Sequence, residues 1–441
     1  MGFEDHPTVR ALRERGESES TEIVSAALLK EIALECGAAD VGLIEITRPA
    51  IAPQIPYIQK VYAKTKTLMA IVCRMNELPV RSQTRSVANE EFHATYDHVN
   101  EACREIVREL TKRGIPACNA IAAFPMELDQ PKIMMVQHKP VAVEAGLGHM
   151  GVHRSVIHPK FGSFILLGTV LLGVEADEYD HPVDYNPCLG CKLCVAACPV
   201  GAIKADGAFD FMTCYTHNYH DFTGNFLNFV ENVVEAKDKK DYRQRIPPSE
   251  TQLIWQSLSF KPQYKAAYCI SVCPAGEEVI SPFLKDRKTY VEDIVKPLLD
   301  KEEVLYIIKG TDADESVPRK FPHKQIKHVR AGRITTSIGG HLFSLRLSFQ
   351  RGAARALDLT SHWTFEDKKE HHATVRVAGK LLEIDDRRHA GDADFKVWVK
   401  TDRWFDYLNL LCELDELFEE GSIRLDGDRE RLDAYLACFP F

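Results

Sequence analysis

The sequence lacks an apolar run long enough to cross a lipid bilayer. Its longest apolar stretch, Phe164 to Val174, is interrupted by Gly168 and Thr169, whereas a membrane-spanning helix needs about 20 apolar residues. The opening Met-Gly-Phe-Glu-Asp-His has no basic segment followed by an apolar one and no twin-arginine signal. His6 stands where a myristoylation signal has Ser or Thr. We therefore expect a cytoplasmic protein with no membrane span.

The sequence also lacks an excess of basic residues. It has 55 Lys and Arg against 64 Asp and Glu, a formal net charge of -9. Proteins that neutralise nucleic-acid phosphates need a surplus of Lys and Arg, so the charge argues against a nucleic-acid binder. No internal repeat or low-complexity tract is present. A chain of 441 residues with 45% apolar content can build two or three domains.

Cysteine is plentiful, with 13 in the chain. Six of these have no paired spacing, which is typical of small apolar core residues in a reducing compartment; they are Cys36, Cys73, Cys103, Cys118, Cys412 and Cys438. The other seven belong to one pattern, which carries most of the functional information.

That pattern is a C-x2-C-x2-C-x3-C-P run followed much later by C-x3-C-P. Bacterial ferredoxins bind iron–sulfur clusters with this spacing, because two-residue steps let one tight loop present three thiolates to a cluster. A four-cysteine zinc site usually has two separated C-x2-C knuckles, so zinc is a weaker interpretation, and a disulfide or chance arrangement is weaker still. The residues are Cys188, Cys191, Cys194, Cys198 and Pro199, then Cys269, Cys273 and Pro274.

The second half of the pattern is incomplete, because Ala266 stands where a full run would have a cysteine. In two-cluster ferredoxins the cysteine before proline binds the other cluster. This rule assigns the first cluster to Cys188, Cys191, Cys194 and Cys273, and the second to Cys198, Cys214 and Cys269. The second cluster then lacks one thiolate. It is either a three-iron cluster or a four-iron cluster completed by water, His217, His220 or Tyr264.

The N-terminal half alternates helical and strand patterns, which predicts an α/β layer fold. Helices are expected from Ser20 or Thr21 to Cys36 and from Asn89 to Arg113; strands are expected at 40–46, 67–75 and 164–173. The polar stretch 216–262 is interpreted as a loop insertion, with a partner-docking element as the alternative.

The C-terminal part predicts a separate small α/β domain. Strands are expected at 373–384 and 394–401, then a helix capped by Asp402 that continues through Phe418, a strand at 422–425 and a last helix. The expected organisation is a loose arm at 1–19, an α/β domain at 20–181, a cluster module at 182–282, a linker at 283–324 and the C-terminal domain at 325–441.

Residues from about 20 to 280 resemble the epoxyqueuosine reductase and reductive dehalogenase superfamily. The resemblance lies in Pro140-Val-Ala-Val-Glu-Ala-Gly-Leu-Gly-His-Met-Gly151, in His153 and Pro159-Lys-Phe-Gly-Ser-Phe-Ile-Leu-Leu-Gly168, in the Cys run, and in Tyr96-Asp97-His98. It implies a cobalamin-reductase-like α/β sandwich with an inserted two-cluster ferredoxin module, and cobalamin as a further cofactor. The residues it implies for cobalamin binding are Tyr96, His138, Gly146, Gly148, His149, Gly151, His153, Gly162 and Ser163.

Glycines 146, 148 and 151 would also allow backbone to approach a large flat ligand closely. A tight turn with no ligand is the competing interpretation of the same residues.

The sequence departs from this superfamily at the proton donor. Epoxyqueuosine reductases carry an acidic residue shortly before the segment that matches Gln137 to Pro140; here Lys132 aligns with it, and an insertion could bring Asp129 or Glu127 into that role. Reductive dehalogenases use a Tyr near a basic residue, and no such Tyr is evident here. The catalytic candidates are therefore Lys132, Asp129 and His153.

The C-terminal domain resembles the sterol-carrier-protein type 2 fold. The order strand, strand, helix, followed by Phe418-Glu-Glu-Gly-Ser-Ile-Arg-Leu-Asp-Gly-Asp428 and a closing helix, carries this resemblance. It implies either an apolar tunnel for a lipid or a structural appendage.

These observations favour a cobalamin-dependent iron–sulfur reductase that cleaves a halide, hydroxyl or oxirane oxygen from a small organic substrate. Electrons from a donor such as ferredoxin or flavodoxin would enter at the second cluster and leave through the first. One alternative is a non-catalytic electron-transfer protein whose C-terminal domain binds a lipid or a partner. Another is a protein that reduces or delivers the corrinoid.

Overall fold

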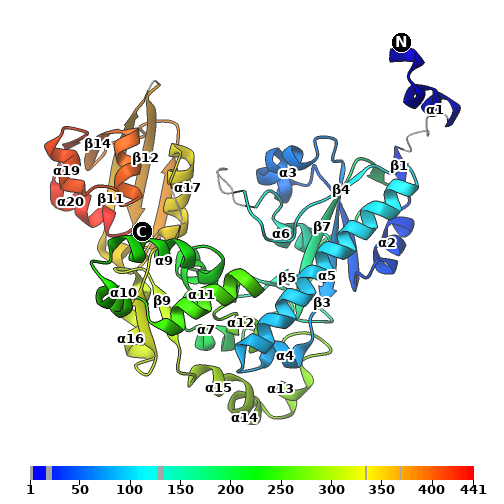
Figure 1. The fold of residues 1–441 in the computed structure, drawn as a ribbon, viewed down its shortest axis with the longest axis horizontal. Helices are drawn as coiled ribbons and strands as arrows, with labels where there is room; N and C mark the ends of the chain where they lie inside the picture. Colours follow the sequence, from blue (N-terminus) through cyan, green and yellow to red (C-terminus); the bar gives the residue numbers. More distant parts are fainter. Residues whose placement is uncertain (1–2, 16–21, 128–133, 333–334, 368) are drawn as a thin grey trace.

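The chain folds into three consecutive parts. The computed structural model describes residues 3–15, 22–127, 134–332, 335–367 and 369–441. Figure 1 shows an N-terminal α/β unit on the right, a helical region in the middle and a C-terminal domain at the upper left. The predicted mixture of helices and sheets is confirmed. Among the described residues, no helix has the length and apolar character needed to cross a membrane.

The N-terminal unit is built on a four-stranded sheet. Its order is β2-β3-β7-β4, with every neighbouring pair antiparallel. The central strand β3 is buried at all but its last residue, as its continuous apolar run requires. The three longer strands are those predicted from the sequence. The bounds are β2 Asp40–Glu45, β3 Thr67–Arg74, β7 Ile165–Leu172 and β4 Ala117–Asn119.

Helices cover both faces of this sheet (Figure 1). On one face α2 and α5 pack their apolar stripes against the strands, and on the other α6 and α3 do so. The predicted helix at 89–113 is confirmed, although it begins one turn earlier. The bounds are α2 Ala26–Glu35, α3 Ile55–Val61, α4 Glu77–Arg81, α5 Arg85–Lys112 and α6 His138–Glu144, with α1 Pro7–Arg15 in the arm.

Short strands complete this unit. β1 (Ile23–Val24) pairs in parallel with β8 (Glu175–Ala176), and β5 (His149–Met150) pairs with β6 (Val156–Ile157). The candidates Lys132 and Asp129, and the predicted helix start at Ser20 or Thr21, lie outside the described residues.

The middle region is almost entirely helical, so the prediction of a loop at 216–262 is wrong. Asp238 caps one helix by accepting hydrogen bonds from two backbone N–H groups, and Pro248 begins the next at a position where proline suits a helix. The bounds are α7 Leu193–Ala197, α8 Phe211–Asn218, α9 Asn225–Glu235, α10 Lys239–Arg245, α11 Pro248–Phe260 and α12 Tyr268–Ser271.

Helices α9 and α11 leave large apolar side chains exposed, among them Phe226, Val234, Trp255 and Phe260. This exposure favours the partner-docking interpretation of the insertion over a plain surface loop.

The segment expected as a linker forms ordered elements. Phe283, Leu298, Leu305 and Val317 pack into one core with Cys194 and its neighbours. Strands β9 and β10 pair in parallel beside it. The bounds are α13 Ser281–Lys285, α14 Arg287–Tyr290, α15 Lys296–Leu299, β9 Val304–Ile307, α16 Asp312–Lys320 and β10 Gln325–His328.

The C-terminal domain is a five-stranded sheet in the order β13-β12-β11-β14-β15, with β11 and β14 parallel. The strand predicted at 373–384 is a hairpin instead, because Gly379 (φ 55°) turns the chain. The predicted helix after Asp402 breaks in two near Leu410, which has φ 57°. The bounds are α17 Ile338–Ser348, β11 Asp358–Glu366, β12 His371–Ala378, β13 Leu381–Asp385, β14 Phe395–Lys400, α18 Thr401–Leu408, α19 Leu414–Glu419, β15 Ile423–Asp426 and α20 Arg429–Leu436.

Candidate iron–sulfur sites

The structure brings four of the seven patterned cysteines to one small pocket. Cys188, Cys191 and Cys194 reach it from a single loop, and Cys273 reaches it from the end of α12. Gly190 (φ 63°) and Lys192 (φ 60°) give this loop two left-handed turns before α7 begins. Such turns let closely spaced residues face a common centre. This is the set that the crossing rule assigned to the first cluster.

A chain of hydrogen bonds supports Cys273. The Cys273 sulfur accepts a hydrogen bond from Ser163. His153 Nε2 lies 3.0 Å from Ser163 Oγ, and His153 Nδ1 accepts from Ser155 N at 3.1 Å. Because Nδ1 accepts, the imidazole proton is on Nε2 and is donated to Ser163.

His153 is therefore a supporting residue in this structure. Burial lowers its pKa to about 4, so the ring is neutral near pH 7. Both ring nitrogens are already engaged, which does not suit the proton donor expected from the sequence. The structure places Ser163 beside a cluster cysteine.

We predict that Ser163→Ala lowers the midpoint potential of the cluster that Cys273 binds. A hydrogen bond to a cluster sulfur stabilises the extra electron of the reduced state. Losing a bond of about 1 kcal/mol corresponds to about 40 mV for one electron. An EPR-monitored redox titration measures the shift. Ser155→Ala is the matched control, since its backbone N–H is retained; an equal shift in both variants would contradict the prediction.

The other three cysteines form a second group. Cys198 ends α7, Cys214 lies on α8 and Cys269 lies on α12. Their charges influence one another, since Cys198 and Cys269 both raise the pKa of Cys214. Cys198 Sγ also accepts a hydrogen bond from Ala202 N at 3.2 Å. This group matches the set assigned to the second cluster.

The chemistry of these thiols fits iron–sulfur clusters. Burial, followed by the neighbouring sulfurs, raises the pKa of Cys194 to about 12, and burial with the charge of Cys198 raises the pKa of Cys269 to about 12. Several neighbouring thiolates, some of them buried, require a positive centre among them. A cationic iron core supplies that charge.

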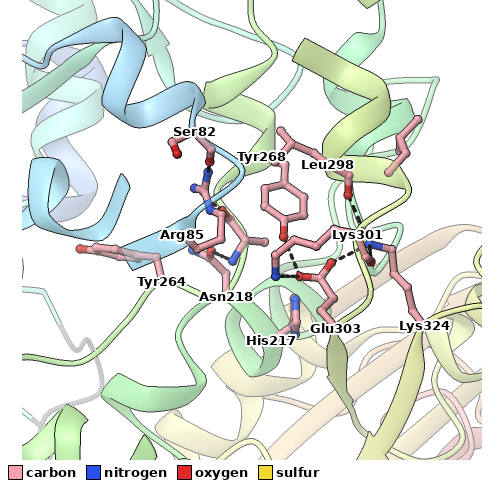
Figure 2. Close-up of polar contacts among 12 residues, drawn as sticks. Ser82, Arg85, His217, Asn218, Tyr264, Tyr268, Leu298, Lys301, Glu303 and Lys324 are labelled. Carbon is pink, nitrogen blue, oxygen red and sulfur yellow. Dashed lines mark hydrogen bonds and ion pairs between the residues drawn. The ribbon is translucent and has the colours of Figure 1, made fainter. Parts of the chain in front are cut away.

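The position of the missing cysteine is rigidly held (Figure 2). Arg85 Nη2 donates to Ala266 O at 2.8 Å, and Asn218 Oδ1 accepts from the N–H groups of Ala266 and Ala267 at 3.1 and 2.8 Å. Next to it, the Tyr268 hydroxyl donates to Glu303 at 2.6 Å. These contacts fix the loop that precedes Cys269 without offering a side chain as ligand.

The fourth-ligand candidates named from the sequence make contacts within the protein, and His217 Nε2 and His220 Nδ1 are buried without a hydrogen-bond partner among the described residues. His217 Nδ1 accepts from Tyr306 N at 3.2 Å, and the His220 ring stacks on Tyr306 at 3.8 Å. The Tyr264 ring packs against Phe222. Tyr219, just beyond the end of α8, was not among the candidates named from the sequence. Burial raises its pKa, and Tyr264, Cys214 and Cys269 add to the rise. Its position does not belong to the cysteine spacing, so that pattern could not indicate it.

Most residues implied for cobalamin binding are engaged in contacts within the protein. The Tyr96 hydroxyl donates to Phe124 O at 2.5 Å. His138 uses both ring nitrogens, at 2.8 Å from Thr169 Oγ1 and 2.9 Å from Ile121 O. His149 Nδ1 lies 3.1 Å from Met150 O. These side chains fix the local backbone.

The glycines face protein backbone. A Cβ on Gly146 would lie 2.6 Å from His181 O, one on Gly148 2.3 Å from Ile157 O, and one on Gly162 1.9 Å from Ala275 O. At Gly151 a Cβ would meet the Ile157 side chain at 2.7 Å. Close packing of chain segments explains these glycines, so they do not form a cradle for a flat ligand in this structure.

Lys139 is an exposed cationic residue near the second group of cysteines. Its Nζ donates to Arg154 O at 2.7 Å, and its charge reaches Cys214 and Cys269. It therefore places a positive charge near the second group of cysteines.

Two family matches fall on this chain. Residues 181–204 match the 4Fe-4S binding domain family, and residues 343–440 match the alkyl sulfatase C-terminal family. The first match confirms the predicted ferredoxin-type iron–sulfur motif.

Epoxyqueuosine reductases are among the relatives. The enzyme from Vibrio cholerae serotype O1 is 24% identical over 340 residues, which cover 74% of this chain and 82% of that one. The structure of epoxyqueuosine reductase from Streptococcus thermophilus covers 61% of this chain and 74% of its own, at 16% identity and a TM-score of 0.32. The sequence match to the Vibrio cholerae enzyme, together with the 4Fe-4S match, confirms the predicted resemblance and the class of the chain, an iron–sulfur reductase.

The C-terminal domain has a more distant match. Sterol carrier protein 2 from Yarrowia lipolytica covers 19% of this chain and 73% of its own, at 14% identity and a TM-score of 0.17. At that score the predicted sterol-carrier fold and its lipid tunnel stay predictions.

Proposed function

We propose that this protein is a two-cluster iron–sulfur reductase that removes an oxygen or halide from an organic substrate. The observation that carries the proposal is the sorting of seven cysteines into two groups beside the α/β unit, with six of the seven buried or partly buried. Ser163 and His153 support the first group, and Lys139 lies beside the second. Electrons could therefore reach a substrate bound against that unit.

The relatives widen the range of substrates that we propose for this protein. Epoxyqueuosine is a modified nucleoside, so the exclusion of nucleic acid that the net charge suggested does not hold against an epoxyqueuosine reductase with 24% identity. We infer that a nucleoside epoxide within RNA is as good a candidate as a small halogenated molecule.

Cobalamin as the electron acceptor rests on the family resemblance. The glycines and histidines implied for it are occupied by protein contacts, so we derive no step through it. Lys139 is the group of this chain that could meet an acceptor beside the second group of cysteines, where its ammonium would attract a negatively charged or electron-rich group.

The electron donor is proposed to be an acidic redox protein such as ferredoxin or flavodoxin. The exposed apolar side chains of α9 and α11 flank α10, which carries Lys239, Lys240 and Arg243. A face that combines apolar and basic side chains suits an acidic partner. The reducing conditions of the cytoplasm would keep the 13 free cysteines reduced.

Metal analysis of anaerobically purified protein tests the proposal. We expect about seven to eight irons per chain with matching sulfide, and bound cobalamin at about one per chain if that acceptor is used. Iron at this level without any corrinoid affinity would leave a two-cluster reductase with another acceptor. Zinc in place of iron would contradict the proposed function.

A further inference from the structure

A large cavity lies between the middle region and the C-terminal domain. Its volume is about 600 Å³, within the range of about 300–1,000 Å³ that is typical of sites for small organic molecules. One wall comes from α8 and α9, through Met212, Tyr215 and Leu227; the other comes from α17, α18, α20 and the last residues of the chain. Among the described residues, none from the five-stranded sheet lines it. The cavity is therefore shared between the two parts, unlike a tunnel inside the C-terminal domain.

The wall is apolar and presents no unpaired charged side chain among the described residues. Its surface is mainly aliphatic and aromatic. The two charged side chains at the cavity satisfy each other, since Arg330 Nη1 lies 2.5 Å from Glu231 Oε1 and Arg330 Nη2 donates to Asn409 O at 2.7 Å. A ligand charge would enter without a counter-ion, which is costly in an apolar site. The apolar lining residues include Leu345, Trp404, Leu408, Leu436, Phe439 and Phe441.

His341 provides one directional polar group. It is buried on α17, and Trp404 Nε1 donates to its Nε2 at 3.3 Å. An indole N–H can only donate, so Nε2 is the unprotonated nitrogen and the proton of the neutral ring is on Nδ1. Burial lowers the pKa of His341 to about 4, which keeps the ring neutral. Among the described residues, Nδ1 makes no hydrogen bond, so its N–H is available to a ligand.

We propose that this cavity binds a neutral, largely apolar small molecule with an oxygen acceptor, such as a ketone or ester carbonyl, that accepts a hydrogen bond from His341 Nδ1. The apolar wall selects the body of the molecule, the lack of a free counter-charge among the described lining residues disfavours ionised head groups, and His341 selects the acceptor. The site is independent of the proposed reductase activity. It adjoins α8, which also carries Cys214, so an occupant would contact the helix that supplies one cysteine of the second group.

Isothermal titration calorimetry of the anaerobic holoprotein tests this proposal with three probes that share an unbranched chain of about ten carbons: 2-decanone, decanoate and decyltrimethylammonium. We expect 2-decanone to bind with one site per chain, and each charged probe to bind at least about tenfold more weakly, because each would be buried unpaired. Decanoate binding as tightly as 2-decanone would overturn the proposal.

Two variants locate the site. Ser344→Trp fills the cavity from α17 and should abolish 2-decanone binding, while Ser249→Trp, at an exposed position of α11, should not. His341→Gln keeps an acceptor near the Nε2 position for Trp404 and removes the Nδ1 donor. It should weaken 2-decanone binding by about threefold to tenfold. Unchanged ketone binding in Ser344→Trp, with the visible cluster spectrum intact, would place the probe elsewhere and refute the proposal.

Discussion

Cys198→Ser is expected to remove the second cluster and to leave the first one in place. Cys198 lies within reach of Cys214 and Cys269 and precedes Pro199, so its thiolate belongs to the group that already lacks one ligand. A site with two remaining thiolates cannot retain a cluster as well as one with three. The iron content should fall by about three to four atoms per chain, and the EPR signals of the first cluster should persist.

Cys191→Ser is the matched variant for the other group. Cys191 lines the pocket with Cys188, Cys194 and Cys273, so its loss should damage the first cluster and preserve the second. Cys73→Ser changes a buried cysteine of the α/β core and should affect neither cluster. If Cys198→Ser and Cys191→Ser removed the same EPR signal from folded protein, the assignment of ligands would be wrong.

The sequence predicted the fold best where its signal is local. The continuous apolar runs of β3 and β7 and the 3.6-residue periodicity of α5 lie in the structure where they were predicted. The cysteine groups could also be predicted, because C-x2-C spacing determines which thiolates can share a loop. The strands, the helix and the first cysteine run depend on residues close together in the chain, whereas the assignment of Cys269 and Cys273 came from the ferredoxin crossing rule.

Features that depend on distant residues could not be predicted. Nothing near Ser163 in the sequence indicates that it donates to Cys273, more than a hundred residues later. The charged segment 235–245 and the pair Pro247 and Pro248 concealed α9 and α11, because such residues are also typical of loops. The left-handed backbone at Leu410 ends a helix that the periodicity of the sequence alone would extend.

The glycines show the same limit in a different way. The sequence predicts that Gly146, Gly148 and Gly151 leave space for a ligand, whereas in the structure backbone of other segments lies against Gly146 and Gly148, and the Ile157 side chain lies against Gly151. A glycine signals a close approach, but only the tertiary fold tells which group approaches.

Gly162→Ala is expected to destabilise the protein strongly and to loosen the first cluster. Gly162 has φ 63°, and a Cβ there would lie 1.9 Å from Ala275 O, which is backbone and cannot rotate away. The adjoining loops are joined by hydrogen bonds from Glu277 N to Pro159 O at 2.9 Å and from Glu278 N to Lys160 O at 3.0 Å. This contact attaches the chain just after Cys273 to the α/β unit, so relieving the clash must displace one of the two loops.

We expect the free energy of unfolding to fall by about 3–5 kcal/mol, since a backbone clash adds to the cost of a left-handed residue with a side chain. The unfolding midpoint should fall by about 5–15 °C, and cluster absorbance should be lost at a lower temperature than in the wild type. Gly207→Ala is the matched control. Gly207 has φ 85° with no atom within 4 Å of the position that a Cβ would take. Gly207→Ala should therefore lower the free energy of unfolding by only about 1–2 kcal/mol, the cost of a left-handed backbone for a residue with a side chain. Equal effects of the two substitutions would show that conformation alone, and not the contact with Ala275, accounts for Gly162.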